Sequence, residues 1–447
     1  MSTSASLLSF LLVAVSFALH NQNASAQSRP SQSAAPNSEQ QGSGPELAGG
    51  NWGRGRRIFH SGAAGCFRCH TARGVGVSLG PDLSALAGRD YTSVLQDVKK
   101  PSAEVRPEFT LYEVELDDGS KRSGVLRTVD GRLFLGDSTG ALQPLAKDRI
   151  REKKSLARSV MPEGLLDPLS EVEVRDLMTF LLTPPPSMPI AGKVAAPPMR
   201  SMKEVSDALA GSLPLPKELR PLRIVLVAGK KDHGPGEHDY PAWQVQWGSL
   251  LTAAEESTIE TAWDFPSEEQ LQTADVLIFF QKGDWNDDRA SKMDAYFERG
   301  GGAIYLHWAV NGGDRAAPFA ERIGMASKAG AIRYRHGPLR LELANTDHPI
   351  LRNLDELDLL DESYWTLAGD PAQITLLASS PEEGKLWPQI WCYERAKGRV
   401  FVAIPGHYNW TFDDPLFRVV LLRGIAWSCR EPIDRFNELV LPGARVK

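Results

Sequence analysis

The most informative chemical motif is Cys66-Phe67-Arg68-Cys69-His70. Two thiols separated by two residues and followed at once by a histidine have the spacing at which haem is attached covalently while the imidazole binds its iron. A redox-active or zinc-binding cysteine pair is the competing interpretation. The chain has only four cysteines in total and no second pair of this kind, and disulfide chemistry does not need the adjacent histidine. We therefore predict one covalent c-type haem with His70 as an axial ligand.

The residues around this motif resemble cytochrome c. Residues 52–59 have the pattern of the helix that precedes the motif in that family, and Gly80-Pro81-Asp82-Leu83 resembles the loop whose proline carbonyl orients the axial histidine. The resemblance implies a methionine as the other axial ligand, on the loop before the last helix. Met161, in Met161-Pro162-Glu163-Gly164, has that position, whereas Met178 lies within the predicted helix and is expected in the core. A His–Met pair favours electron transfer over oxygen activation.

Histidines form a second group of candidate residues. Six of the nine histidines lie beyond residue 221, and four of these six follow predicted strands or lie on Gly- and Asp-rich loops. Histidines clustered with a carboxylate permit either a divalent metal site or acid–base catalysis. A core histidine remains the alternative for His307, and a solvated turn carboxylate remains the alternative for Glu362. We expect His336 and His348 to be structural, and the functional candidates are His233, His238, His307, Glu362 and His407.

The elements that must position these histidines alternate between strand and helix. Apolar runs predict strands, and amphipathic stretches between or after them predict helices. This order is typical of a parallel sheet covered by helices on both faces, in which ligands bind outside the carboxyl ends of the strands. The predicted strands are 222–228, 274–280, 303–307 and 399–404, and the predicted helices are 242–254, 288–299 and 415–429.

The region with the haem motif, residues 51–183, is predicted to be helical at both ends. Ser170 and Glu173 form a capping box ahead of its last helix. Between about 109 and 154 the apolar residues alternate with a period of two, and the turns Asp117-Asp118-Gly119 and Asp130-Gly131 interrupt them. We predict a small antiparallel β insertion within an α-helical domain.

The remaining segments set the domain boundaries. A short apolar run from Leu7 to Leu19, followed by Ala24-Ser25-Ala26, predicts a signal peptide at 1–26 that is cleaved after Ala26. The run lacks a preceding Lys or Arg, so an uncleaved anchor is the alternative. Residues 27–50 are expected to be a flexible linker and 184–221 a Pro-rich connector, which leaves 222–440 as the second domain. The protein is therefore expected in the periplasm or outside the cell.

Composition excludes several classes of function. The formal net charge is −6 without a basic cluster, which excludes the electrostatic footprint of a nucleic-acid-binding protein. No stretch after the N-terminus is long and apolar enough to span a bilayer. Four cysteines are too few for a disulfide scaffold. Whether Cys392 and Cys429 are free thiols or a disulfide stays open.

The two regions each resemble a known family. The β insertion and the Met-Pro-Glu-Gly-Leu end make residues 52–183 similar to the haem-binding domain of planctomycete secreted proteins. Residues 222–430 resemble the ThuA-like (trehalose-utilisation) family, which implies a flavodoxin-like fold of the class I glutamine amidotransferase type. The matching motifs are Lys231-Asp232-His233, Gly236-Glu237-His238-Asp239-Tyr240, Gly300-Gly301-Gly302, Leu306-His307-Trp308, Asp347-His348-Pro349, Asp361-Glu362-Ser363-Tyr364, Gly406-His407 and Thr411-Phe412.

One departure from that fold family decides against amidotransferase chemistry. The turn that holds a nucleophilic cysteine in amidotransferases here holds His307-Trp308, so cysteine-hydrolase chemistry is not expected. The resemblance links the domain to sugars, and four tryptophans near the candidate loops are either sugar-stacking or core residues. These tryptophans are Trp243, Trp308, Trp365 and Trp410.

Three functional hypotheses follow. The first is an electron-transfer protein whose redox partner is a sugar dehydrogenase or another cytochrome, with a second domain that binds carbohydrate. The second is an enzyme that acts on glycosides or keto-sugars by acid–base or metal-assisted chemistry. The third is a non-catalytic sugar-binding module.

Overall fold

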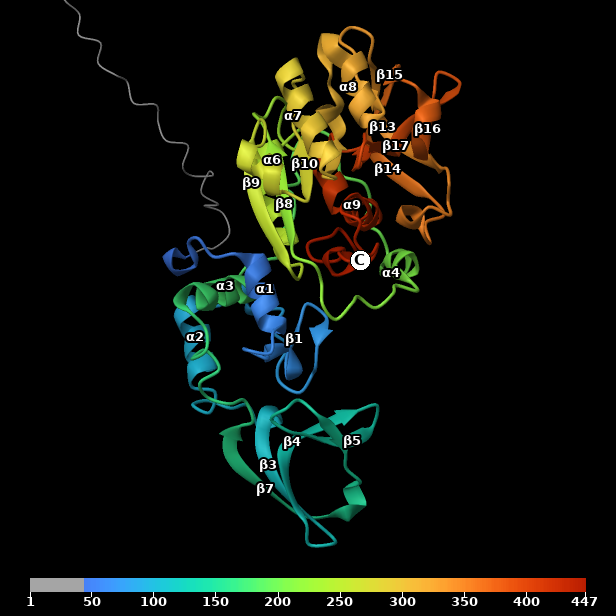
Figure 1. Cartoon of the computed structure of the whole chain (residues 1–447). Coiled ribbons are helices and arrows are strands. Elements are labelled where there is room, and N and C mark those ends of the chain that lie inside the picture. The colour runs from blue at the N-terminus through green and yellow to red at the C-terminus, as the bar shows by residue number, and fades with distance from the viewer. Residues whose placement is uncertain (1–43) are drawn as a thin grey trace, which may run out of the picture. The chain divides into compact units, whose positions relative to one another are not determined.

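The N-terminal region is built on three helices, α1 (Trp52–His60), α2 (Tyr91–Lys99) and α3 (Glu171–Leu182). The computed structural model describes residues 44–447, so the predicted signal peptide, its cleavage after Ala26 and most of the 27–50 linker lie outside the described residues. Helix α3 begins with the predicted capping box of Ser170 and Glu173. Arg54 on α1 pairs with Asp176 on α3 at 2.6 Å, and these two helices lie against each other (Figure 1).

The β insertion is present and is slightly longer than predicted. Its five strands form one antiparallel sheet in the order β6-β5-β4-β3-β7. The last strand ends at Ser159, five residues past the predicted boundary of 154, because residues 155–159 are mostly exposed and show no alternation of apolar residues that would mark the strand. The strands are β3 (Thr110–Leu116), β4 (Lys121–Val129), β5 (Arg132–Gly136), β6 (Leu142–Pro144) and β7 (Ile150–Ser159), and the short β1 (Thr71–Ala72) and β2 (Val75–Gly76) pair separately.

The C-terminal domain contains a nine-stranded sheet in the order β14-β13-β16-β17-β18-β11-β10-β8-β9. Five strands, from β18 to β9, are parallel. Four of them, β8, β10, β11 and β18, match the predicted strands, whereas β9 was not predicted. The predicted parallel sheet forms only part of the observed sheet, because the other four strands are antiparallel and make the sheet mixed. The strands are β8 (Leu222–Ala228), β9 (Ser257–Trp263), β10 (Val276–Phe280), β11 (Gly302–Leu306), β13 (Arg333–Leu343), β14 (Leu357–Trp365), β16 (Thr375–Glu382), β17 (Lys385–Arg395) and β18 (Gly398–Ala403), with a separate pair of β12 (Met325–Ala326) and β15 (Ala368–Gly369).

Helices cover both faces of the parallel part of the sheet (Figure 1). Alternate residues of β8 point to opposite faces, so that Ile224 and Leu226 pack with α5 and α9 while Val225 and Val227 pack with α6, α7 and α8. The carboxyl ends of the parallel strands remain uncovered by these helices, and their loops carry most of the candidate residues. The helices are α5 (Tyr240–Leu251), α6 (Glu268–Thr273), α7 (Asp287–Glu298), α8 (Ala316–Ile323) and α9 (Pro415–Ser428).

Described parts of both predicted connecting segments pack against the rest of the protein or form regular structure. Near the end of the predicted 27–50 linker, Leu47 is buried in the core of the N-terminal helices and is not part of a flexible segment. The Pro-rich connector at 184–221 contains the helix α4 (Met202–Leu209). Cys392 and Cys429 are both buried free thiols. Within residues 44–447, no helix has the length and apolarity to cross a membrane.

Candidate functional site

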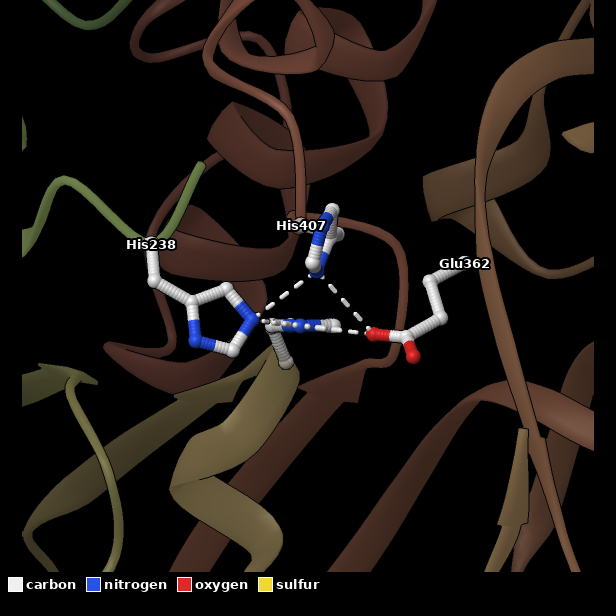
Figure 2. Close-up of side chains that lie close together, drawn as sticks. His238, Glu362 and His407 are labelled. Carbon is white, nitrogen blue, oxygen red and sulfur yellow. Dashed lines mark hydrogen bonds and ion pairs between the residues drawn. The ribbon is translucent and has the colours of Figure 1, made fainter. Parts of the chain in front are cut away.

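Four side chains of the C-terminal domain converge on one point. His238 Nε2 lies 2.7 Å from His307 Nε2 and 3.0 Å from His407 Nδ1, and Glu362 Oε2 lies 3.2 Å from both His307 Nε2 and His407 Nδ1. Figure 2 shows His238, His407 and Glu362 pointing toward one another. In a tetrahedral zinc site with metal–ligand distances of about 2.0–2.1 Å, ligand atoms lie about 3.3 Å apart. The four-residue group therefore has nearly the spacing of a metal-ligand set.

The carboxyl ends of three parallel strands supply the histidines. His238 lies on the loop after β8, His307 directly follows β11, and His407 follows β18. His238 and His307 have positive φ angles of 42° and 53°, which non-glycine residues adopt at a cost of about 1–3 kcal/mol. Such strain persists where the surroundings fix the backbone, and it is concentrated at functional sites. His307 thus occupies the sharp turn at which the sequence predicted a histidine in place of a nucleophile.

The far nitrogens of two imidazoles fix their tautomers. His307 Nδ1 donates to the carbonyl oxygen of Ile404 at 2.8 Å, and His238 Nδ1 donates to Asp232 Oδ1 at 2.9 Å. Both Nε2 atoms therefore present lone pairs, although they lie 2.7 Å apart. A proton can be shared by only two of these atoms, whereas a metal ion can be coordinated by all four ligand atoms of the group. Carboxylate and carbonyl acceptors behind the imidazoles are also the usual support of metal-binding histidines.

Glu362 is held from both sides. Its Oε1 atom lies 3.3 Å from His336 Nε2, which leaves Oε2 for the three imidazoles. The neighbouring Asp361 is fully buried, and its Oδ1 accepts hydrogen bonds from the backbone N–H groups of Glu362, Gly406 and His407. Asp361 therefore ties the strand that carries Glu362 to the loop that carries His407.

Burial sets the ionisation of the group. Burial lowers the pKa of His238 to about 3, although its hydrogen bond to Asp232 acts in the opposite direction. Burial alone would raise the pKa of the Glu362 carboxyl, but the adjacent His307 and His407 hold it well below its usual range. Neutral imidazole and ionised carboxylate are the forms that bind a metal ion.

The four-residue group opens into a pocket of about 630 Å³. This volume lies within the range of roughly 300–1,000 Å³ in which proteins enclose small ligands. Of the four tryptophans that the sequence singled out, Trp243, Trp365 and Trp410 are buried core residues and only Trp308 lines the pocket. The lining residues outside the group are Asp232, His233, Glu237, Lys282, Trp308, Ile332, Tyr334, His336, Tyr364 and Tyr408.

The structure thus brings together four of the five predicted candidates of this domain. His233 contacts Asp232 at 2.9 Å on the rim, with 43% of its side chain exposed, and does not join the group. His348 lies elsewhere, where its Nδ1 accepts from the backbone of Ile350. His336, expected to be structural, instead lines the pocket beside Glu362, because β13 and β14 pair His336 directly with Glu362.

Sequence reasoning missed the residues that support the group. Asp232 and Asp361 lay inside quoted motifs but were not singled out, and Tyr364, whose hydroxyl lies 3.1 Å from His307 Nε2, was likewise passed over. A carboxylate next to a candidate histidine or glutamate in the sequence was the only available signal.

Substitution of Asp232 by asparagine tests the support of His238. The amide keeps the size of the side chain but removes the carboxylate that fixes the Nδ1–H tautomer. We expect metal affinity to fall by about 10–100-fold, the usual effect of removing such a partner. Isothermal titration with Zn²⁺ measures it, and Asp288→Asn, at an exposed position of α7, is the matched control. An unchanged dissociation constant in Asp232→Asn would contradict this role.

The Cys66–His70 motif forms a second candidate site. Cys66 and Cys69 are half-buried free thiols at the two ends of a short 3-10 turn, and burial raises the pKa of Cys66 to about 11. His70 Nδ1 donates to the carbonyl oxygen of Pro81 at 2.9 Å, as the resemblance implied. A Cβ atom on Gly80 would lie 2.6 Å from His70 Cε1, so only glycine leaves room for this ring. His70 Nε2 is thereby left free for a ligand.

The two candidate methionines differ in their surroundings. Met178 is fully buried in the helical core, as expected for a packing residue. Met161 is half-buried on the loop between β7 and α3, where its backbone N–H donates to Ser159 Oγ at 3.1 Å. Its role as the axial ligand stays a prediction.

Comparison with known proteins gives one family match. Residues 225–428 match the family ThuA, described as trehalose utilisation, and no curated protein matches the chain significantly. Solved structures similar to the chain include a ThuA-like protein of Parabacteroides merdae, with 18% identity over 47% of this chain and 90% of that chain and a TM-score of 0.38. A ThuA-like protein of Bacteroides uniformis has 16% identity over 48% and 95% of the two chains and a TM-score of 0.41. The β-galactosidase of Rahnella sp. R3 has 11% identity over 48% and 32% and a TM-score of 0.36.

All four residues of the convergent group lie inside the matched range. Residues 225–428 are therefore a ThuA-like domain that carries a buried His₃Glu group at the carboxyl ends of its parallel strands.

Proposed function

We propose that this chain is an exported monohaem c-type cytochrome whose ThuA-like domain processes a carbohydrate at a divalent metal ion. The convergence of His238, His307, Glu362 and His407 carries the proposal for the metal. These residues would hold the ion, which supplies Lewis-acid polarisation of a bound oxygen. Imidazole and carboxylate ligands favour zinc or a neighbouring first-row metal.

Burial and neighbouring residues keep the four metal-binding side chains in place. The four metal-binding side chains are buried, with exposed fractions between 0 and 6%. A substrate would therefore reach them from the pocket. His336 keeps Glu362 Oε2 turned toward the imidazoles by contacting its other oxygen. Asp232 and Ile404 keep two imidazoles in the metal-binding tautomer.

The walls of the pocket support a carbohydrate as the ligand. Trp308 is half-buried, and Tyr334 is 60% exposed although it is a large aromatic residue. Both line the same pocket as polar groups such as Glu237 and Lys282. Aromatic faces beside hydrogen-bonding groups suit the apolar and hydroxylated faces of a sugar ring. The family description, trehalose utilisation, points to the same class of ligand.

Turnover of a panel of glycosides and keto-glycosides tests this function. We expect hydrolysis or rearrangement of at least one sugar, loss of activity on dialysis against a chelator, and recovery with one equivalent of metal, because the ion supplies the polarisation. Product formation is measured by chromatography, with His348→Ala as the control variant. Binding of sugars without turnover would leave the non-catalytic sugar-binding hypothesis.

The N-terminal region is proposed to carry electrons. Free thiols at Cys66 and Cys69, the Pro81-oriented imidazole of His70 and the space at Gly80 fit a covalent haem. The haem would supply one-electron transfer, with Met161 as the second axial ligand. Its partner is proposed to be a sugar dehydrogenase or another cytochrome. Export to the periplasm or medium is part of the proposal and rests on the predicted signal peptide.

A further inference from the structure

A short piece of the predicted connector, residues 186–192, lies against the loops of the four-residue group, and we call it the strap. Its first half is anchored in the domain. Met188 is 2% exposed, and its backbone N–H donates to Asp413 Oδ2 at 2.7 Å. Asp413 in turn pairs with the buried Arg418 at 2.6 Å. The strap therefore does not behave as a plain spacer between two domains.

In the second half of the strap, backbone atoms contact backbone atoms of the loop that carries His238. A Cβ atom on Gly236 would lie 1.8 Å from the carbonyl oxygen of Ala191, and one on Gly192 would lie 2.7 Å from that of Pro235. Both glycines have positive φ angles, of 80° and 115°. The contact thus depends on glycine from both sides, since any side chain would push the two segments apart.

Asn409 connects the strap and this loop to His407. Its side-chain Nδ2 donates to the carbonyl oxygen of Pro189 at 3.1 Å, and its backbone N–H donates to that of Gly236 at 2.9 Å. The backbone N–H of His238 donates to the carbonyl oxygen of His407 at 3.0 Å. Strap, His238 loop and His407 loop are therefore hydrogen-bonded in succession, and the last two end in imidazoles whose nitrogens lie 3.0 Å apart.

We propose that the strap is a positioning element of the metal-binding group. It holds the His238 loop in contact with the His407 loop, so that the ring nitrogens of the two histidines lie close together. Pro186 follows the end of α3 at Leu182 by four residues (186 − 182), so the peptide that leaves the predicted haem region also positions two metal ligands. The affinity readout below rests on the proposed metal site, but the placement of the loops does not.

Hydrogen exchange of the metal-free full-length chain tests the placement. Gly192→Ala introduces a Cβ at the contact. The control, Gly384→Ala, introduces a Cβ at another glycine of positive φ, 74°, where nothing lies within 4 Å. We expect amide exchange in residues 232–240 and 405–410 to accelerate about tenfold in Gly192→Ala, equivalent to about 1.4 kcal/mol of local opening. In Gly192→Ala, exchange in β8 should match the wild type. In Gly384→Ala, exchange throughout the chain should match the wild type. Equal exchange in all three proteins, or faster exchange throughout the domain in Gly192→Ala, would overturn the proposal.

Titration with Co²⁺ tests the consequence for the site. Asn409→Ala removes the hydrogen bond to Pro189 from the other side and serves as the second variant. We expect both Gly192→Ala and Asn409→Ala to weaken Co²⁺ binding about 10–100-fold and to change its ligand-field spectrum, because His238 is held less firmly. Accelerated exchange with unchanged affinity and spectrum would overturn the positioning role. A wild type that binds no Co²⁺ would refute the proposed metal site alone, and hydrogen exchange would still decide on the strap.

Discussion

The variant His307→Ala is expected to lose stoichiometric metal. The wild type, purified without chelator, should contain one divalent first-row metal per ThuA-like domain, measured by inductively coupled plasma mass spectrometry. His307 is fully buried and its Nε2 lies within 3.2 Å of both His238 Nε2 and Glu362 Oε2. Its removal deletes one of four ligands and should weaken binding by about 100-fold or more, beyond the effect of losing a supporting residue.

Metal binding should also stabilise the wild type against heat. At a metal concentration of about 100 times the dissociation constant, binding to the folded state adds about 2.7 kcal/mol. For a domain of about 200 residues this corresponds to a rise in Tm of about 5–10 °C, which His307→Ala should not show. His348→Ala removes a histidine outside the group and should keep both the metal and the shift. A wild type without metal and without a shift would refute the assignment.

The second large effect is expected at the haem motif. Expressed with a c-type haem maturation system, the wild type should carry one covalent haem, seen as a haem-stained band on a denaturing gel and as the mass of one haem in the intact protein. The double variant Cys66→Ser with Cys69→Ser should lose it completely, because no other half-buried thiol lies beside His70 in the described chain. Covalent haem retained by the double variant would overturn the assignment.

Two single variants make this experiment specific. Cys392→Ser removes a thiol that is buried in the ThuA-like domain and should leave the haem band unchanged. Met161→Ala should also keep the covalent bonds, but it should lower the reduction potential and abolish the near-infrared sulfur-to-iron band of the oxidised protein, since only the axial ligand changes. An unchanged spectrum in Met161→Ala would move the ligand role to another residue.

The local features of the chain were predictable because their signals lie within a few residues. The capping box at Ser170 and the alternating pattern of the β insertion each depend on neighbours in sequence. The four central parallel strands were equally accessible, because apolar runs such as 222–228 mark strands that are buried on both faces, whereas the edge strand β9 has no such run and was not predicted. The antiparallel strand β13 was not predicted, since its charged residues and Gly337-Pro338 interrupt any apolar alternation.

The four-residue group shows where sequence reasoning stops. Strand ends identified His238, His307 and His407 as candidates, since parallel strands bring their carboxyl ends to one edge. Glu362 comes from the antiparallel strand β14, and its burial beside His307 depends on how that strand packs. The pairing of β13 with β14 also places His336 at the pocket, and three of the four candidate tryptophans are buried in the core by tertiary packing.

The sequence by itself thus identified the candidate residues for binding a metal ion or a haem, because residue type and short spacing are local properties. Tertiary structure decided which of them meet, since His238 and His407 lie 169 residues apart in the chain yet 3.0 Å apart in space. It also decided tautomers, burial and the role of the strap. These depend on hydrogen bonds and close backbone contacts between distant segments, and no pattern within one segment encodes them.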